Sequence, residues 1–195
     1  MTEFSRKPSI FNVPNIFTTA RLILAIATFA LIDGAFYFPA LVVFVIAAST
    51  YWIDGYWPRK YDQVTQVDRI FDPFVDKVII CGAFIFLAAV PDSGVRAWMA
   101  TLVVGREILV TALRSFIENA GGDFSANMAG KLKMVFQCVA VGASLFALWW
   151  PTNPARGQVP PWLDWTLFVS VWVAVLSTVQ SGLGYVVAAI RFMQE

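Results

Sequence analysis

The sequence contains no histidine and few charged residues. The absence of histidine excludes a histidine general base and histidine metal ligands, so a metal ion would have to bind through oxygen atoms. Charged residues make up 14% of the 195 residues, whereas soluble domains contain about 25%. Hydrophobic residues make up 58%, and the mean hydropathy is +0.68. Because a soluble core of this size cannot bury so much apolar surface, the composition predicts an integral membrane protein.

Cysteine is also scarce, and a targeting signal is missing. The two cysteines, Cys81 and Cys138, both lie in apolar runs, which favours buried small side chains over a disulfide. Residues 1–15 have no short apolar core followed by a cleavage site, so we expect no signal peptide. The net charge of +1 identifies no class of partner by itself. We expect no nucleic-acid partner.

Six apolar runs predict six transmembrane helices in a single domain of residues 1–195. The runs are close to or longer than the roughly 20 residues with which a helix crosses a bilayer. We expect the spans at 15–32, 36–57, 72–90, 95–116, 131–150 and 162–190. Turn residues, charged segments and a proline-rich segment separate them, and we find no internal repeat. The predicted fold class is therefore an all-α polytopic membrane protein.

The basic residues are distributed unequally between the two predicted sides of the membrane. With six spans, both termini lie on one side, and Arg96 and Arg156 lie on the other. Ten basic residues share the side of the termini: Arg6, Lys7, Arg59, Lys60, Arg69, Lys77, Arg114, Lys131, Lys133 and Arg191. Because basic residues favour the cytoplasmic side, we expect both termini and the loops 58–71 and 117–130 to be cytoplasmic. The tryptophans at 149, 150, 162 and 165 would then form an outer aromatic belt.

Carboxylates cluster where the second span ends and the third begins. Asp72 and Asp76 are four residues apart, so they share one face of a helix, and Asp54 ends the preceding span. Carboxylates this close repel unless a cation lies between them. Gly55 permits close backbone approach, and Arg59 supplies a guanidinium suited to phosphate. The pattern predicts a divalent metal and a phosphorylated substrate; the alternative is a set of surface charges that cap and anchor two helices.

The fourth span contains charges halfway along its length. Arg106 and Glu107 lie where a charge costs about 2.5–3.5 kcal/mol or more. They could pair within the bundle, or they could line a water-filled cavity open to the cytoplasm, which intramembrane charges favour. Arg114 follows two turns later, and Lys131 and Lys133 begin the fifth span. A small dianion requires a cationic pocket, which these residues could form; anchoring at the cytoplasmic face is the alternative for the lysines.

The stretch from Tyr51 to Asp76 resembles the signature of the CDP-alcohol phosphatidyltransferase family, D-x2-D-G-x2-A-R-x8-G-x3-D-x3-D. Here it reads Y-x2-D-G-x2-P-R-x8-D-x3-D-x3-D, so five of the eight specified positions and all of the spacing are retained. Residues 14–21 are similar to the PNxLTxxR opening of the family. Residues 71–77, 106–114 and 130–133 resemble the branch that makes phosphatidylglycerol phosphate. The similarity extends over nearly the whole chain.

The resemblance implies a homodimeric enzyme of the cell (inner) membrane, embedded in the lipid bilayer with its active site facing the cytoplasm. Its substrates would be CDP-diacylglycerol and sn-glycerol 3-phosphate, and its products CMP and phosphatidylglycerol phosphate. The family uses two divalent ions, Mg²⁺ or Mn²⁺. By motif position, the metal ligands would be Asp54, Asp72 and Asp76, of which Asp76 would also be the general base. The CDP contacts would be Asp54, Gly55 and Arg59, and the acceptor-phosphate contacts Arg106, Arg114, Lys131 and Lys133.

Three positions depart from the signature: Tyr51, Pro58 and Asp68. Tyr51 replaces an aspartate, and a neutral phenol is a poor ligand for Mg²⁺. Pro58 replaces an alanine and would kink the second helix if that helix continued. Asp68 replaces a glycine; if the third helix extends back, it forms a ladder with Asp72 and Asp76 and could supply the charge that Tyr51 removes. We expect the three changes to reduce activity strongly.

Three functions therefore compete. The first is phosphatidyl transfer, and the second is a catalytically inactive family member that binds a nucleotide-lipid or acts as a partner subunit. The third is transport of a small anion through a cavity at Arg106 and Arg114. Transporters usually contain repeats or broken helices at midplane, and we find none in the sequence. Inositol phosphate, serine and a lipid are alternative acceptors, of which serine is disfavoured by the nearby cations.

Overall fold

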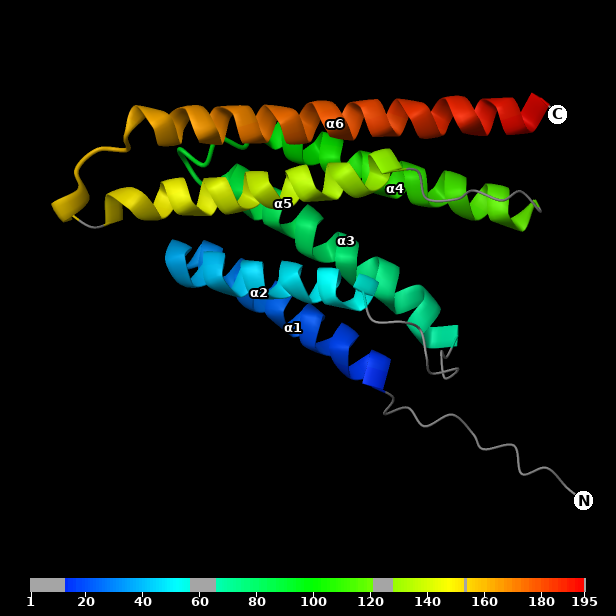
Figure 1. The fold of residues 1–195 in the computed structure, drawn as a ribbon, viewed down its shortest axis with the longest axis horizontal. Coiled ribbons are helices and arrows are strands. Elements are labelled where there is room, and N and C mark those ends of the chain that lie inside the picture. The colour runs from blue at the N-terminus through cyan, green and yellow to red at the C-terminus, as the bar shows by residue number, and fades with distance from the viewer. Residues whose placement is uncertain (1–12, 57–65, 121–127, 153, 195) are drawn as a thin grey trace, which may run out of the picture.

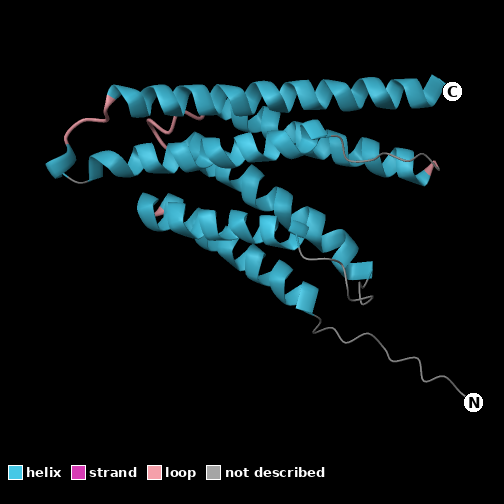
Figure 2. Cartoon of the chain, in the orientation of Figure 1, coloured by secondary structure: helices cyan, strands magenta, loops and turns pink. Residues whose placement is uncertain are grey.

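The computed structural model describes residues 13–56, 66–120, 128–152 and 154–194. For 13–17, 51–56, 66–73, 118–119, 128–129 and 131, it describes the backbone alone. These residues form helices and contain no strand, as Figure 2 shows for the described parts. The α-helices are α1 (Val13–Asp33), α2 (Tyr37–Tyr56), α3 (Gln66–Ala89), α4 (Ala97–Asn119), α5 (Met128–Trp149) and α6 (Pro161–Gln194). Two short 3-10 helices, η1 (Trp150–Thr152) and η2 (Pro154–Arg156), join α5 to α6. The predicted all-α class is confirmed.

The helices run alternately in opposite directions (Figure 1). As a result, α1 begins and α6 ends on the same side of the molecule, and α2 ends and α3 begins on that side as well. α1 packs against α2 and α3, and α4 packs against α3 and α6. α5 packs against α2, α3 and α6. The helices that contain the predicted site residues are thus held together through α3 and α5.

Most helix boundaries lie within a few residues of the predicted ones, but α3 begins well before residue 72. Its first turns contain Asp68, Arg69 and Asp72, which hydropathy excludes from an apolar span. A helix can continue beyond the edge of its apolar run, because backbone hydrogen bonds within the helix do not depend on burial. α2 ends at Tyr56, before Pro58. Pro58 itself and the residues around it up to Thr65 lie outside the described part of the chain.

Two tight turns, one between α1 and α2 and one between α3 and α4, lie on the side of the molecule opposite to the beginning of α1 (Figure 1). At the end of α1, Ala35 has a positive φ of 58°, and Phe36 N donates to Leu31 O at 2.8 Å. This is the Schellman arrangement that satisfies the last carbonyls of a helix. Between α3 and α4, Gly94 has a φ of 73°, and an added Cβ would lie 2.9 Å from Leu167 Cγ. Glycine at 94 therefore provides both the backbone conformation and the close approach of α6.

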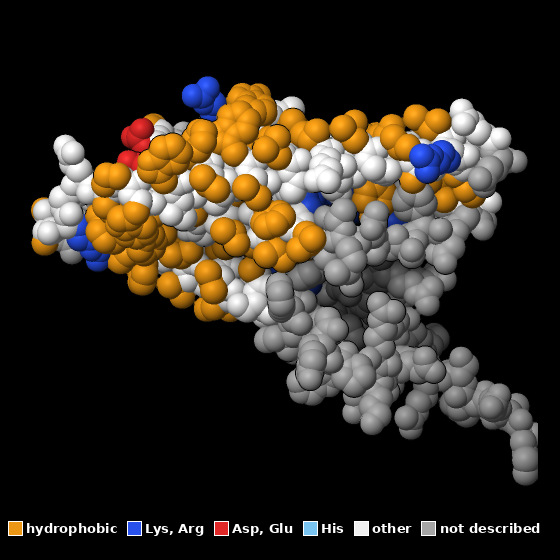
Figure 3. All heavy atoms as spheres, turned by 45° about the horizontal axis from the view of Figure 1, so that its top comes forward, with side chains coloured by type: hydrophobic (Ala, Val, Ile, Leu, Met, Phe, Trp, Pro, Cys, Tyr) orange, Lys and Arg blue, Asp and Glu red, His pale blue; other side chains and the backbone are white. Residues whose placement is uncertain are grey.

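The apolar residues divide into a buried core and an exposed apolar surface. Leu87, Val103 and Leu145 are completely buried. In contrast, large side chains on the outside of the helices, such as Ile108 and Leu183, are more than half exposed, and hydrophobic atoms cover much of the face drawn in Figure 3. Such extensive apolar exposure is typical of a surface that contacts lipid. Two described helical segments, Leu132–Thr152 and Pro161–Gln194, are long and apolar enough to cross a membrane.

Aromatic residues gather where α5 passes into α6. The rings of Trp150 and Trp162 meet edge to face with centroids 6.0 Å apart. Arg156 Cζ lies 3.7 Å from the centroid of the Trp149 ring, a distance at which a cation is attracted to the ring face. Trp165 is strongly exposed on the next turn of α6. This grouping is typical of side chains at a membrane–water interface.

Candidate functional site

The signature carboxylates lie on α2 and α3. Asp54 belongs to the last turn of α2, on the same side of the molecule as the start of α3 (Figure 1). α3 extends through positions 68, 72 and 76, and a spacing of four residues places these positions on one helical face. The backbone geometry that the Asp68 hypothesis requires is therefore present. The side chains of Asp54, Asp68 and Asp72 lie outside the described residues, as does that of Tyr51.

This donor set fits a divalent cation by its chemistry. Carboxylate oxygens on one helical face are the hard ligands that Mg²⁺ and Mn²⁺ prefer. The sequence contains no histidine that would favour a softer metal. Among the side chains that the structure describes, no three potential ligands form a group, since Asp76 is the only signature carboxylate among them. A metal site at Asp54, Asp72 and Asp76 stays a prediction.

Asp76 forms an ion pair with α1. Arg21 Nη1 donates to Asp76 Oδ1 at 2.6 Å, and the two side chains are 6% and 21% exposed. The sequence interpretation placed Arg21 in the 14–21 segment but gave it no role. An arginine in an apolar run was the signal, since a cation there requires a partner within the bundle. The ion pair holds the Asp76 carboxylate at the interface of α1 and α3.

Glu107 binds two cations inside the bundle. Its Oε1 accepts from Arg106 Nη1 at 3.1 Å and from Nζ of Lys133 on α5. The Arg106 and Glu107 side chains are 9% and 10% exposed, and that of Lys133 is 6% exposed. We name Arg106, Glu107 and Lys133 the buried triad. The pairing that the sequence allowed for Arg106 and Glu107 is present, and Lys133 is an additional partner.

Helix α6 supports Arg106 from the other side of the triad. Arg106 Nη2 donates to Ser181 Oγ at 2.6 Å, and Arg106 Cζ lies 5.4 Å from the centroid of the Tyr185 ring. A Cβ added to Gly182 would lie 3.2 Å from Arg106 Cγ, so the absence of a side chain at 182 lets the arginine lie along α6. Arg106 is thus fixed by a carboxylate, a hydroxyl and an aromatic ring.

Helix α3 reaches the triad through a threonine. Lys77 Nζ donates to Thr111 Oγ1, which donates to the backbone oxygen of Glu107 at 2.6 Å. Arg114 is exposed two turns farther along α4 than Glu107, and its like charge opposes that of Lys77. The structure therefore brings Arg106, Lys133, Lys77 and Arg114 into one region. Sequence reasoning missed the contributions of Thr111 and Ser181, because a hydroxyl in an apolar helix usually bonds to its own backbone.

Three further predicted site residues lie in or next to segments outside the described residues. Arg59 lies outside the described residues, and Lys131 belongs to the first turns of α5 with only its backbone described. Gly55 lies in the last turn of α2. Their predicted roles toward CDP and the acceptor phosphate stay predictions.

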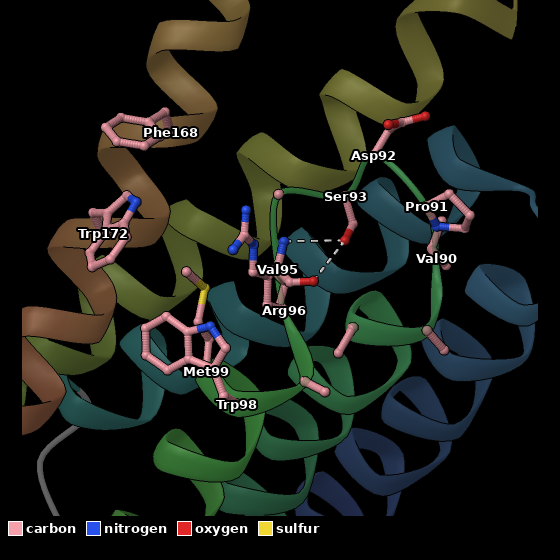
Figure 4. A pocket seen from close by; sticks show the side chains of 14 residues that line it. Val90, Pro91, Asp92, Ser93, Val95, Arg96, Trp98, Met99, Phe168 and Trp172 are labelled. Carbon is pink, nitrogen blue, oxygen red and sulfur yellow. Dashed lines mark hydrogen bonds between the residues drawn. The ribbon is translucent and has the colours of Figure 1, made fainter.

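A pocket lies at the other end of α3 from Asp76. Residues 88–99 of the α3–α4 connection line it, together with Phe168 and Trp172 of α6 (Figure 4). Within it, Val95 N donates to Ser93 Oγ at 3.2 Å. The sequence identified residues 91–94 only as a turn. Its largely apolar lining and its position at the opposite end of the helix separate it from the carboxylates and the buried triad.

Comparison with known proteins covers almost the whole chain. Residues 11–190 match the CDP-alcohol phosphatidyltransferase family. A protein of Bacillus subtilis (strain 168) named CDP-diacylglycerol--glycerol-3-phosphate 3-phosphatidyltransferase is 32% identical over 191 residues, which cover 90% of this chain and 94% of the relative. A protein of Escherichia coli (strain K12) with the same name is 30% identical over 192 residues, which cover 92% of this chain and 95% of the relative. The chain belongs to the CDP-alcohol phosphatidyltransferase family.

Proposed function

We propose that the protein transfers a phosphatidyl group from CDP-diacylglycerol to sn-glycerol 3-phosphate, releasing CMP and phosphatidylglycerol phosphate. The observation that carries the acceptor assignment is the pairing of Arg106 and Lys133 with the one carboxylate of Glu107, with Lys77 bound to Thr111 one turn away. A surplus of cations inside a bundle favours a small dianion such as a phosphate monoester. Two relatives, which match this chain over nearly their full length, are named for this activity. Phosphate contacts are assigned to Arg106, Arg114, Lys131 and Lys133.

The donor would bind where α2 ends and α3 begins. Asp54, Gly55 and Arg59 are assigned to the CDP part, and Asp72 and Asp76 share a helical face next to it. Asp54, Asp72 and Asp76, with Asp68 as an additional ligand, would hold two divalent ions, Mg²⁺ or Mn²⁺. When bound, such ions stabilise negative charge on the diphosphate and on the departing CMP. Asp76 would accept the proton of the acceptor hydroxyl, and the ion pair with Arg21 orients its carboxylate.

The proposed setting is a bacterial-type inner membrane, crossed by all six helices with both termini and the active site cytoplasmic. The alternating directions of the helices in Figure 1 support this topology, as does the exposed apolar surface. The charges of α3 and α4 lie toward one side, where the positive-inside rule places the cytoplasm. A homodimer is the proposed assembly.

A reconstituted assay tests the activity. The purified chain in lipid vesicles is supplied with CDP-diacylglycerol, glycerol 3-phosphate and Mg²⁺ or Mn²⁺, and CMP release is measured. The control is a chain with Tyr51→Asp, Pro58→Ala and Asp68→Gly together, which restores the signature. We expect slow CMP release from the natural chain and faster release from the restored chain.

Each other outcome has a distinct meaning. Equal rates would show that the three departures do not impair the site. Release by the restored chain alone would identify the natural chain as the catalytically inactive alternative. If neither chain released CMP with glycerol 3-phosphate, the acceptor assignment would be wrong.

A further inference from the structure

We propose that Glu107 is a positioning residue, which holds Arg106 and Lys133 as a preformed pair of cations for the phosphate of the acceptor. This inference rests on the proposed function. Glu107 is not assigned to metal, to CDP or to the acceptor. It acts through the two cations that it binds, which come from two different helices.

The geometry of the triad explains why a carboxylate is needed. Arg106 and Lys133 both donate to the same oxygen, Oε1 of Glu107. Two cations gathered this closely in an apolar interior would repel each other and separate without an intervening anion. The remaining contacts of Arg106, to Ser181 and Tyr185, are with neutral groups. Glu107 is therefore the charged group that sets the spacing of the pair among the described residues.

The buried triad has a surplus of positive charge. Arg106 and Lys133 contribute two positive charges and Glu107 contributes one negative charge, and Lys77 and Arg114 are further cations on α3 and α4. This surplus favours an anion such as a phosphate monoester, whose charge is about −1.5 to −2 at pH 7. A salt bridge that served packing alone would need one cation for one carboxylate. The arrangement keeps the cations in place and leaves enough charge to bind the ligand.

The backbone of Glu107 is also connected to helix α3. Its carbonyl oxygen accepts a hydrogen bond from Thr111, and Thr111 accepts one from Lys77 of α3. The residue that holds Arg106 and Lys133 with its carboxylate is therefore linked to Lys77 through its backbone carbonyl and one turn of α4.

The test is the kinetic behaviour of Glu107→Gln in the reconstituted enzyme. The amide keeps the size of the side chain but removes its charge. We expect the KM for glycerol 3-phosphate to rise about tenfold or more, while the KM for CDP-diacylglycerol changes less than about twofold. The matched control is Asp164→Asn, a carboxylate-to-amide change in the first turn of α6, which should leave both KM values unchanged.

A second variant keeps the test decisive if Glu107→Gln folds poorly. Glu107→Asp retains the charge and moves it by one methylene, so we expect a smaller rise in the KM for glycerol 3-phosphate. An unchanged or lowered KM for glycerol 3-phosphate in Glu107→Gln would overturn the inference. The loss of a negative charge near the phosphate would then account for the result without a positioning role for Glu107. If, in both variants, the KM for glycerol 3-phosphate and the KM for CDP-diacylglycerol rose equally, the inference would also be overturned. Absence of CMP release by the unaltered enzyme would instead reject the proposed function.

Discussion

At the scale of single residues, the structure adds partners that sequence patterns do not specify. The sequence singled out Asp76, Arg106, Glu107 and Lys133 by their positions in apolar runs, where charges are costly. It offered the Arg106–Glu107 pair but not the contact between Arg21 and Asp76, which are 55 positions apart. Helical periodicity reports only the face on which a side chain lies. The partner is decided by which helices pack together, and that information is distributed over the whole core.

The Arg21–Asp76 pair leads to a prediction about stability. Arg21→Ala leaves a half-buried carboxylate without its guanidinium, so we expect the free energy of unfolding to fall by about 1–3 kcal/mol. In Arg21→Ala combined with Asp76→Ala, the loss should be smaller than the sum of the two single losses. Unfolding of the four proteins in detergent micelles measures the difference. Strict additivity of the two losses would show that the pair is not coupled.

Thr111 provides a matched comparison on α4. Thr111 and Thr101 both donate to the backbone oxygen four residues earlier, but of the two only Thr111 also accepts a hydrogen bond from Lys77. We expect Thr111→Val to lower the free energy of unfolding by about 0.5–1.5 kcal/mol more than Thr101→Val. Denaturant unfolding of both variants in the same detergent checks the difference. Equal effects would mean that the Lys77 contact contributes no stability.

At the scale of helices, the sequence predicted the existence and type of the helices well and the residues at which they begin and end less well. The apolar runs identified the six α-helices of the described residues, because hydropathy integrates over many residues. The start of α3 at Gln66 was missed because charged residues occupy its first turns. The first span was predicted to end at residue 32, and α1 ends at Asp33. The positive φ of Ala35 in the turn that follows was not predicted, because a local chain reversal depends on the packing of the following helix.

The contact between α1 and α3 depends on Gly82. A Cβ added there would lie 2.1 Å from Cζ of Phe29, so Gly82→Ala forces the aromatic ring or the helix to move. We expect a loss of about 1–3 kcal/mol in the free energy of unfolding. Gly105→Ala on α4 is the control, since nothing lies within 4 Å of its added Cβ, and it should be neutral or stabilising by about 0.5–1 kcal/mol. Thermal unfolding in micelles separates the two variants, and equal stability would argue against a close helix contact.

Because α3 begins before residue 68, the hypothesis that Asp68 compensates for Tyr51 can be tested with a variant that keeps the helix. Asp68→Asn preserves the helix but removes the charge four residues before Asp72. If Asp68 compensates for Tyr51, we expect the Mg²⁺ concentration for half-maximal activity to rise about tenfold. A direct metal-binding measurement by calorimetry should show the same shift. Unchanged metal affinity would reject the compensation.

At the scale of the whole molecule, the number of apolar runs predicted how the first and last helices are oriented. The six described α-helices alternate in direction, which places the beginning of α1 and the end of α6 on one side (Figure 1). That this side faces the cytoplasm, as the positive-inside rule indicates, stays a prediction. The sequence could not predict the packing order, in which α5 touches α2, α3 and α6. That order follows from the shapes of all the buried faces together.

The proposed orientation is testable with introduced cysteines. In a background of Cys81→Ser and Cys138→Ser, Gln158→Cys lies between α5 and α6 and Gln194→Cys at the end of α6, both exposed. A membrane-impermeant maleimide added to intact spheroplasts should label the cysteine at 158 and not the one at 194. Permeabilised spheroplasts are the control, in which both should react. Labelling with the opposite preference would reverse the proposed topology.

The length of α6 allows the depth of the proposed acceptor site to be inferred. Its 34 residues extend about 51 Å, whereas the hydrocarbon layer is about 30 Å thick, so one end must project into water. If the tryptophans at its beginning mark the outer boundary, the 20 residues from Trp162 to Ser181 extend about 30 Å. The Ser181–Arg106 contact would then lie at the inner edge of the hydrocarbon layer. Under the proposed function, a water-soluble acceptor and a lipid-anchored donor would meet at this level.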